Sequence, residues 1–257
     1  MGTGIIIKTD AEIGIMRQAG QIVARGLRLL QGMVKPGVST ADLDAAFEKH
    51  VRDSGARPTF KGYRGFPASI CASVNEEVVH GIPSTDRVLQ DGDIISIDAG
   101  ATFQGYVGDS AVTVGVGKIG DKAQKLIEVT RECLEEAIRA VRPGGMLSHI
   151  ARAVQTHAER NGFSVVREYV GHGIGTSMHE APQVPNYIMD PIDSFEHELK
   201  PGMVIAIEPM VNEGTRHVKT LKDNWTVVTK DKRISAHFEH TVAVTRTGNE
   251  VLTRYKE

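Results

Sequence analysis

Parts of this 257-residue sequence repeat one another, in the same order along the chain. The segment VKPG, which begins at Val34, matches VRPG at Val141, and later residues match at the same spacing without gaps. Further on, GDIISIDAG from Gly92 resembles GMVIAIEPM from Gly202. Matches that keep one order indicate two related halves, each a supersecondary unit of the same kind. Two unrelated segments with similar turn chemistry are the alternative.

Each half is predicted to contain two helices followed by strands. Apolar residues recur at helical spacing, and Pro-Gly turns come before the second helix of each half. We predict helices over about 10–33, 39–54 and 121–141, a helix ending at Gly162, a strand over 70–74 and a strand–turn–strand unit over 93–116. This pattern predicts an α/β chain of two pseudo-symmetric halves, about 10–117 and 121–250, packed as one domain over 1–257. A site is expected where the halves meet, because clefts favour such junctions.

Composition restricts the classes of partner. The formal net charge is −2, so the chain lacks the basic footprint of a nucleic-acid-binding protein, and no specific DNA partner is expected. No window reaches the roughly 18 apolar residues of a membrane span, and the isoleucine run at 5–7 is too short for a secretion signal, so no membrane is expected. Two cysteines, Cys71 and Cys133, are too few for a disulfide framework. We therefore expect a cytoplasmic protein; a single disulfide is the alternative.

Two carboxylates lie on the predicted strand–turn–strand unit. An isoleucine-rich strand ends on Asp98, and Asp109 follows a glycine-bearing turn. If the turn centres on residues 103–104, the two lie directly opposite each other; if it centres on residues 104–105, they are diagonal neighbours. Either register puts both side chains on one face, because side chains alternate with period two.

The second half carries acidic residues in a matching arrangement. The apolar strand MVIAI ends on Glu208, which the repeat places on Asp98, and HFEHTVAV puts Glu239 in another strand. Four carboxylates then face one another, and leaving even one of them charged and unpaired in low dielectric costs several kcal/mol. Protonation, Arg or Lys partners, or metal ions are the possible compensations, and the strand segments themselves carry no Lys or Arg. Two divalent cations with a bridging hydroxide leave such a centre near neutral.

His172, in YVGHGIG, adds a candidate nitrogen ligand between glycines that let the backbone come close. Four carboxylates and one imidazole suit Mn, Fe(II), Co(II) or Zn. Paired metals acidify a water and clamp both ends of a hydrolytic displacement. Taken singly, each of these residues is more often an ordinary turn, cap or loop residue. The hypothesis of a metal-dependent hydrolase therefore depends on all five occurring together in matching halves.

These residues resemble the type I methionine aminopeptidases over almost the whole chain. The segments that carry the resemblance are GYRGFPASICASVNEEVVHGIP, GDIISIDAGATFQGYVGDSAVT, YVGHGIGTSMHEAPQVPNY, GMVIAIEPM and DNWTVVTKDKRISAHFEHTV. The resemblance implies the pita-bread fold, an α+β arrangement in which helices cover a curved, mostly antiparallel sheet. It implies removal of the initiator methionine from nascent proteins and peptides, by a hydroxide that bridges two divalent metals and attacks the first peptide carbonyl. The metal ligands that it implies are Asp98, Asp109, His172, Glu208 and Glu239.

The resemblance also implies roles for substrate and catalytic residues. His80 contacts the substrate near the scissile amide, His179 stabilises the oxyanion, and Glu208 carries a proton from the water to the leaving amine. The implied methionine pocket is Phe60, Tyr63, Phe66, Cys71, Met178 and Trp225. An apolar, soft-lined cavity suits an unbranched thioether. Three of these residues differ from what is frequent in bacterial members: Phe60 replaces a smaller residue, Phe66 replaces Tyr, and Met178 replaces an aromatic residue. These differences put the shape of the pocket in question. The alternative is that the six residues are ordinary core residues.

Three rival interpretations stay in view. An X-Pro peptidase shares the implied fold, but such relatives usually carry an additional N-terminal domain. A catalytically silent binding module of this fold loses ligands, and all five positions here keep them. A type II enzyme carries a helical insertion, for which the roughly thirty residues between Glu208 and Glu239 leave no room. We expect a monomer acting on peptides or nascent chains that begin with Met, with the ribosome as a candidate partner.

Overall fold

The helices begin and end close to where the sequence predicts. The computed structural model describes residues 4–189 and 196–256, and its helices are α1 (Asp10–Met33), α2 (Thr40–Asp53), α3 (Asp121–Ala140) and α4 (Leu147–Arg160). Thr9 and Ser39 cap α1 and α2, and in both cases the acidic third residue of the helix bonds back to the cap. Each such box satisfies two otherwise free N–H groups, so local sequence determines both starts. None of the described helices is long and apolar enough to cross a bilayer.

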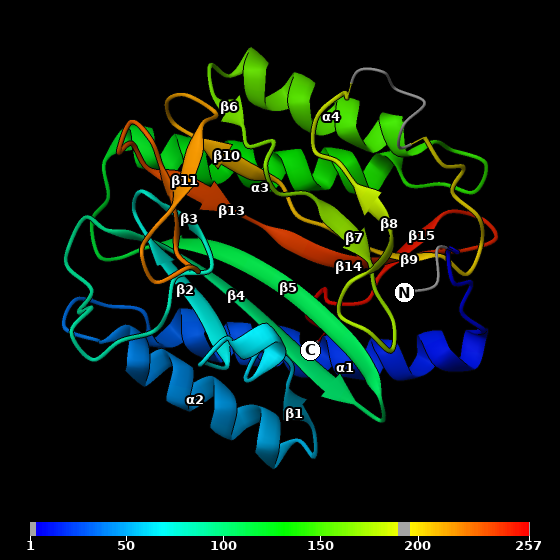
Figure 1. The fold of residues 1–257 in the computed structure, drawn as a ribbon, viewed down its shortest axis with the longest axis horizontal. Coiled ribbons are helices and arrows are strands. Elements are labelled where there is room, and N and C mark those ends of the chain that lie inside the picture. The colour runs from blue at the N-terminus through cyan, green and yellow to red at the C-terminus, as the bar shows by residue number, and fades with distance from the viewer. Residues whose placement is uncertain (1–3, 190–195, 257) are drawn as a thin grey trace.

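One nine-stranded sheet runs through both halves (Figure 1). Its order is β1–β4–β5–β14–β9–β7–β8, with β2 on β4 and β15 on β14, and every pair is antiparallel. Its strands are β1 (Arg57–Pro58), β2 (Ile70–Val74), β4 (Ile94–Phe103), β5 (Tyr106–Gly115), β7 (Gly171–Gly173), β8 (Glu180–Val184), β9 (Val204–Ile207), β14 (Glu239–Val244) and β15 (Asn249–Val251). The expected α+β class with a mostly antiparallel sheet is confirmed.

Two small sheets and one short turn complete the described elements. The small sheets are β13 (Ser235–His237), β10 (Met210–Asn212) and β6 (Ser164–Val165), and β11 (Val218–Thr220), β12 (Val227–Thr229) and β3 (Glu77–Val79); the 3₁₀ turn η1 is Tyr63–Gly65. The halves join where β5 of the first pairs with β14 of the second, through Ala111 and Glu239. Figure 1 shows α1 and α2 on one side of the molecule and α3 and α4 on the other. The assignment of one domain over 1–257 stays a prediction.

Alternate residues of β4 supply the core and the site. Ile95 and Ile97 pack with Phe47 in the apolar cluster beneath α1 and α2. Because side chains alternate along a strand, Asp98 points away from these helices. The corresponding cluster beneath α3 and α4 includes Leu134, Ile150 and Ile205. Each pair of helices thus covers its own half and leaves the carboxylate-bearing face of the sheet open to the junction.

The hairpin of β4 and β5 settles the register of the first two carboxylates. Phe103 pairs with Tyr106, so the turn centres on Gln104 and Gly105, whose φ angles are 47° and 83°. Positive φ at both central residues belongs to the type I′ turn that matches the twist of the flanking strands. Asp98 then lies opposite Ala111, and Asp109 lies opposite Gly100. The second of the two predicted registers, with the carboxylates as diagonal neighbours, is confirmed.

Candidate metal centre and catalytic site

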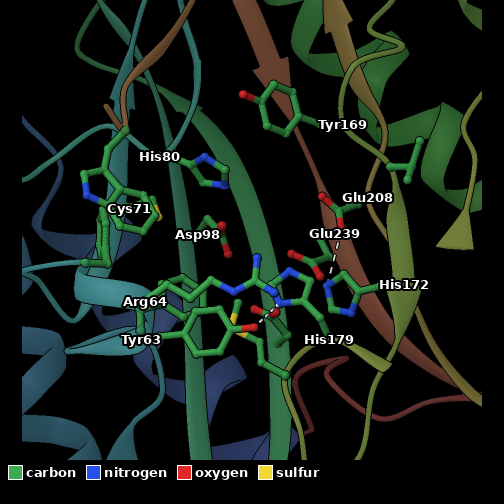
Figure 2. Close-up of a pocket in the computed structure, with 16 residues that line it drawn as sticks. Tyr63, Arg64, Cys71, His80, Asp98, Tyr169, His172, His179, Glu208 and Glu239 are labelled. Atoms are coloured by element: carbon green, nitrogen blue, oxygen red, sulfur yellow. Dashed lines mark hydrogen bonds and ion pairs between the residues drawn. The ribbon is translucent and has the colours of Figure 1, made fainter. Parts of the chain in front are cut away.

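Five predicted ligands from both halves line a single cavity (Figure 2). Asp98 and Asp109 come from the hairpin β4–β5, His172 from β7 and Glu239 from the start of β14, while Glu208 follows the end of β9. Asp109, His172 and Glu239 each offer a ligand atom, and these atoms all lie within 4.8 Å of one another. The structure therefore brings together side chains that are up to 141 positions apart (98 to 239) in the chain.

The carboxylates are buried without partners that would compensate their charge. One oxygen each of Asp98, Asp109 and Glu239 is buried with no hydrogen bond. Burial raises the pKa of all four carboxyl groups, that of Asp98 to about 7, and the charges of neighbouring acids raise the other three further. Among the described residues, no Lys or Arg forms an ion pair with any of the four. Within the described part of the chain, the charge of the carboxylates is therefore not compensated by Lys or Arg side chains, which was one of the three alternatives.

His172 completes a donor set that fits divalent cations. Its Nδ1–H donates to the carbonyl of Gly173 at 2.9 Å, which leaves Nε2 with a free lone pair, 3.5 Å from Glu208 Oε1. Burial lowers the pKa of His172 to about 3, so the ring is neutral, the form that ligates metals. The flanking glycines are required here, because a Cβ at Gly171 would lie 2.3 Å from the carbonyl oxygen of Ala206. Unsatisfied carboxylate oxygens beside an imidazole lone pair are the ligands that a hard or borderline cation prefers.

Two further predicted residues, His80 and His179, line the same cavity (Figure 2). The Tyr63 hydroxyl contacts His179 Nδ1 at 2.8 Å, and the His179 ring centre is 4.2 Å from that of His172. His80 packs edge-on against Tyr169, with ring centres 5.5 Å apart. Burial lowers the pKa of His80 to about 4, and burial together with the Arg64 charge lowers that of His179. Both imidazoles are therefore neutral near pH 7 and can donate a hydrogen bond without carrying a charge.

The six predicted pocket residues form the apolar wall of this cavity. Phe60, Phe66 and Cys71 are buried in one cluster, and Met178 and Trp225 pack against it. The Phe66 and Trp225 rings meet edge to face with centres 5.1 Å apart. The sixth, Tyr63, lines the same cavity. The structure thus places an apolar pocket directly beside the carboxylates; the metal and substrate roles of all these residues stay predictions.

Sequence reasoning missed an ion pair behind His179. Lys8 Nζ lies 2.6 Å from Glu180 Oε2, and these side chains are 3% and 6% exposed. Glu180 directly follows His179, and its Oε1 accepts a hydrogen bond from the Ser177 N–H. The pair therefore ties the loop that carries His179 to the N-terminal segment. The only signal in the sequence was that an acidic residue, Glu180, follows His179. Its partner Lys8 lies 172 positions from Glu180 and belongs to no periodic pattern.

Exchanging Glu180 for glutamine is expected to lower both stability and kcat. It leaves the Lys8 ammonium buried and unpaired, which costs about 3–5 kcal/mol. The displaced His179 loop is expected to lower kcat about tenfold, since small misplacements near the reacting atoms are costly. Adding Lys8→Met to that variant removes the stranded charge, so thermal unfolding should recover while kcat does not.

The matched control is Glu250→Gln, which breaks the pair with Arg17 that ties α1 to β15 through contacts of 2.7 and 2.9 Å. That variant should leave kcat unchanged. An equal fall in kcat in both variants, or full recovery of kcat in the double variant, contradicts a positioning role for the Lys8–Glu180 pair.

Comparison with known proteins identifies a family and close relatives. Residues 14–246 match the model of metallopeptidase family M24. The sequence is 58% identical to methionine aminopeptidase 1 of Bacillus subtilis strain 168, over 97% of this chain and 99% of the relative. It is 46% identical to the methionine aminopeptidase of Escherichia coli K12, over 98% of this chain and 95% of the relative.

Solved structures agree on the fold. The methionine aminopeptidase from Thermotoga maritima is similar with a TM-score of 0.94 at 44% identity, covering 97% of this chain and 99% of that one. The Xaa-Pro dipeptidase from Bacillus anthracis is similar with a TM-score of 0.76 at 25% identity, covering 98% of this chain but 62% of that one. The expected pita-bread architecture is confirmed by these neighbours. The fold alone does not separate the two activities, because both classes share it.

Proposed function

We propose an activity for this chain on the premise that it belongs to metallopeptidase family M24, which its match over residues 14–246 establishes. It is a methionine aminopeptidase of type I, a hydrolase that removes the N-terminal methionine from peptides and proteins. One observation carries this choice within the fold: the cavity joins the buried carboxylates and His172 to an apolar pocket built by Phe66, Met178 and Trp225. That pocket suits a flexible thioether side chain.

The metal site is proposed to be Asp98, Asp109, His172, Glu208 and Glu239. Two divalent cations of Mn, Fe(II), Co(II) or Zn, when bound there, supply an acidified water and positive charge beside the scissile carbonyl. The donor set supports this, since three of its oxygens have no other partner. The free α-amine of the substrate would bind to a metal held by these residues, which would set an exopeptidase register.

The remaining chemistry is assigned to side chains of the chain itself. We assign the Tyr63 hydroxyl as the donor to His179 Nδ1, which leaves Nε2–H free, and we assign that Nε2–H to the oxyanion. His80, which lines the same cavity, is assigned to contact the substrate near the scissile amide. Glu208, which lines the same cavity, is assigned to accept the proton of the attacking water and to pass it to the leaving amine. The apolar pocket holds the methionine side chain while these groups act.

Substrate hydrolysis by stripped and reloaded protein tests the proposed function. Protein freed of metal and then reloaded with Mn, Fe(II), Co(II) or Zn is incubated with Met-Ala-Ser and, separately, with a peptide whose second residue is proline. We expect release of methionine from Met-Ala-Ser after reloading, none from the stripped protein, and little cleavage of the X-Pro peptide. Preferential cleavage of the X-Pro peptide would instead favour the dipeptidase side of the family.

We also propose that the enzyme works as a cytoplasmic monomer at the ribosome. The hairpin β11–β12 supports binding to the ribosome, because it carries Trp225 of the pocket wall and lies among exposed lysines, namely Lys219, Lys222, Lys230 and Lys232. Such a basic surface attracts phosphate backbones. Replacing the four lysines by glutamate should abolish co-sedimentation with ribosomes at physiological salt while Met-Ala-Ser is still cleaved. Unchanged co-sedimentation counts against this surface.

A further inference from the structure

A groove leads out of the catalytic cavity between the two halves. Its walls are the segment from β1 to η1 in the first half and the segment from β7 into β8 in the second. Six residues line both the cavity and the groove: Tyr63, Arg64, Val170, His172, Met178 and His179. Because His179 lies at this border, the part of a substrate beyond its first peptide bond leaves the cavity along the groove. This step rests on the proposed function.

The groove carries positive charge on two arginines that have no ion-pair partner among residues 4–189 and 196–256. Its ionisable lining residues other than those at the cavity border are Arg57, Lys61 and Glu180. Lys61 forms an ion pair with Glu48 at 2.6 Å, and Glu180 forms an ion pair with Lys8. Neither Arg57 nor Arg64 forms an ion pair with a carboxylate of the described residues, and both are exposed. The groove that follows the cavity is therefore basic.

Local backbone geometry aims Arg64 at the border. It occupies the left-handed region (φ 49°, ψ 24°) inside the turn η1, between Gly62 and Gly65, whose φ angles are also positive. The guanidinium carbon lies 5.3 Å from the centre of the Tyr63 ring, a cation–π contact that holds it in place. Figure 2 shows the Arg64 side chain beside Tyr63 and His179. Arg57, on β1, lines the groove but not the cavity, so it lies further along the path of the substrate.

We propose that Arg57 and Arg64 make this enzyme favour substrates with acidic side chains shortly after the second residue. The third residue of the substrate meets Arg64, and a later residue meets Arg57. Thr59, Ser177 and Gln183, also in the lining, supply hydrogen-bonding groups for the peptide backbone between them. The charge of the groove thus favours carboxylates that lie downstream of the scissile bond.

Three peptides that differ in charge at positions three and four test the proposal: Met-Ala-Glu-Glu-Ser, Met-Ala-Gln-Gln-Ser and Met-Ala-Lys-Lys-Ser. Exposed ion pairs of this kind change an equilibrium by up to about fivefold each. We expect kcat/KM to fall in the order Glu, Gln, Lys, with the Glu peptide about threefold or more above the Gln peptide at low salt. The preference should shrink as salt screens the charges.

The variant Arg57→Gln/Arg64→Gln should bring the Glu-to-Gln ratio of kcat/KM close to one. The matched control is Arg25→Gln/Arg28→Gln, which removes the same charge from exposed residues of α1 that line neither the cavity nor the groove. That control should keep the ratio of the unmodified protein.

Equal kcat/KM for the three peptides, or a ratio that survives loss of both groove arginines, overturns the inference. Such a result would leave the proposed function standing, because methionine is still released. Failure to release methionine from any of the three peptides would instead count against the proposed function itself.

Discussion

Replacing Glu208 by glutamine is expected to lower kcat at least about a thousandfold while leaving the fold intact. Positioned acid–base groups contribute about 10²–10⁴ in rate, and an amide at this position cannot accept the proton of the attacking water. The substitution keeps the side-chain shape and exchanges a buried carboxyl for a neutral amide. The backbone at this position is held independently, since its carbonyl accepts a hydrogen bond from Asn186 Nδ2 at 3.0 Å. The melting temperature of the metal-stripped protein should therefore be unchanged or higher.

The measurement is steady-state hydrolysis of Met-Ala-Ser at saturating metal, with thermal unfolding recorded on the same proteins after removal of metal. Glu77→Gln is the matched control, because Glu77 is a partly buried carboxyl with a raised pKa on β3 that lines neither the cavity nor the groove. Its kcat should equal that of the unmodified protein. A Glu208→Gln variant within threefold of the unmodified kcat would remove Glu208 from the proton transfer.

Metal-stripped protein is expected to lose stability as pH rises above about 6.5. Burial raises the folded-state pKa of Asp109, Glu208 and Glu239 well above the ordinary values, so the folded state holds protons that the unfolded chain has released. Stability then falls with rising pH, by up to about 1.4 kcal/mol per pH unit for each group that titrates. Asp98, with a pKa of about 7, contributes at the lower end of this range.

The buried histidines determine the pH, about 6.5, above which the stability of the metal-stripped protein is expected to fall. Burial lowers the pKa of His172 and His237 to about 3 and that of His80 to about 4. For these groups the unfolded chain binds more protons below about pH 6.5, so their effect on stability has the opposite sign there. Above about pH 6.5 they are neutral in both states, and the raised pKa values of the carboxyl groups determine most of the slope.

Urea unfolding of stripped and reloaded protein at pH 6.5, 7.5 and 8.5 tests this expectation. Reloaded protein should be more stable and nearly independent of pH, because bound cations compensate the ionised carboxylates. Asp109→Asn should reduce the slope of the stripped protein, whereas Asp231→Asn, at an exposed residue, should not. Stripped protein that is as stable at pH 8.5 as at pH 6.5 contradicts the account.

Local structure was predictable because its causes are local. Helix α1 was expected over about 10–33 and spans Asp10–Met33, since apolar period and an N-terminal cap both act within a few residues. The hairpin register had two solutions in the sequence, because both turns keep Asp98 and Asp109 on one face. The backbone of Gln104 and Gly105, both with positive φ, decides between them, and that conformation is not encoded by hydrophobic period.

Long-range contacts were accessible through the internal repeat and the family resemblance, not through periodicity. The pairing of Glu239 with Ala111 joins strands 128 positions apart (111 to 239), and it brings the acids of the two halves together. The Lys8–Glu180 pair and the position of Arg64 were missed for the same reason. Each depends on where a turn, or a segment without a periodic hydrophobic pattern, lies in the folded chain. The neighbouring residues in the sequence do not indicate that position.

Anomalous diffraction from crystals of freshly reconstituted protein, recorded at the absorption edge of the loaded metal, tests the metal centre most directly. We predict two peaks inside the cavity. The carboxylates of Asp98, Asp109, Glu208 and Glu239 should surround the pair, and His172 Nε2 should bind one of the two metals. A map with no peak in this cavity, or one in which these carboxylates instead pair with Lys or Arg side chains, would contradict the account.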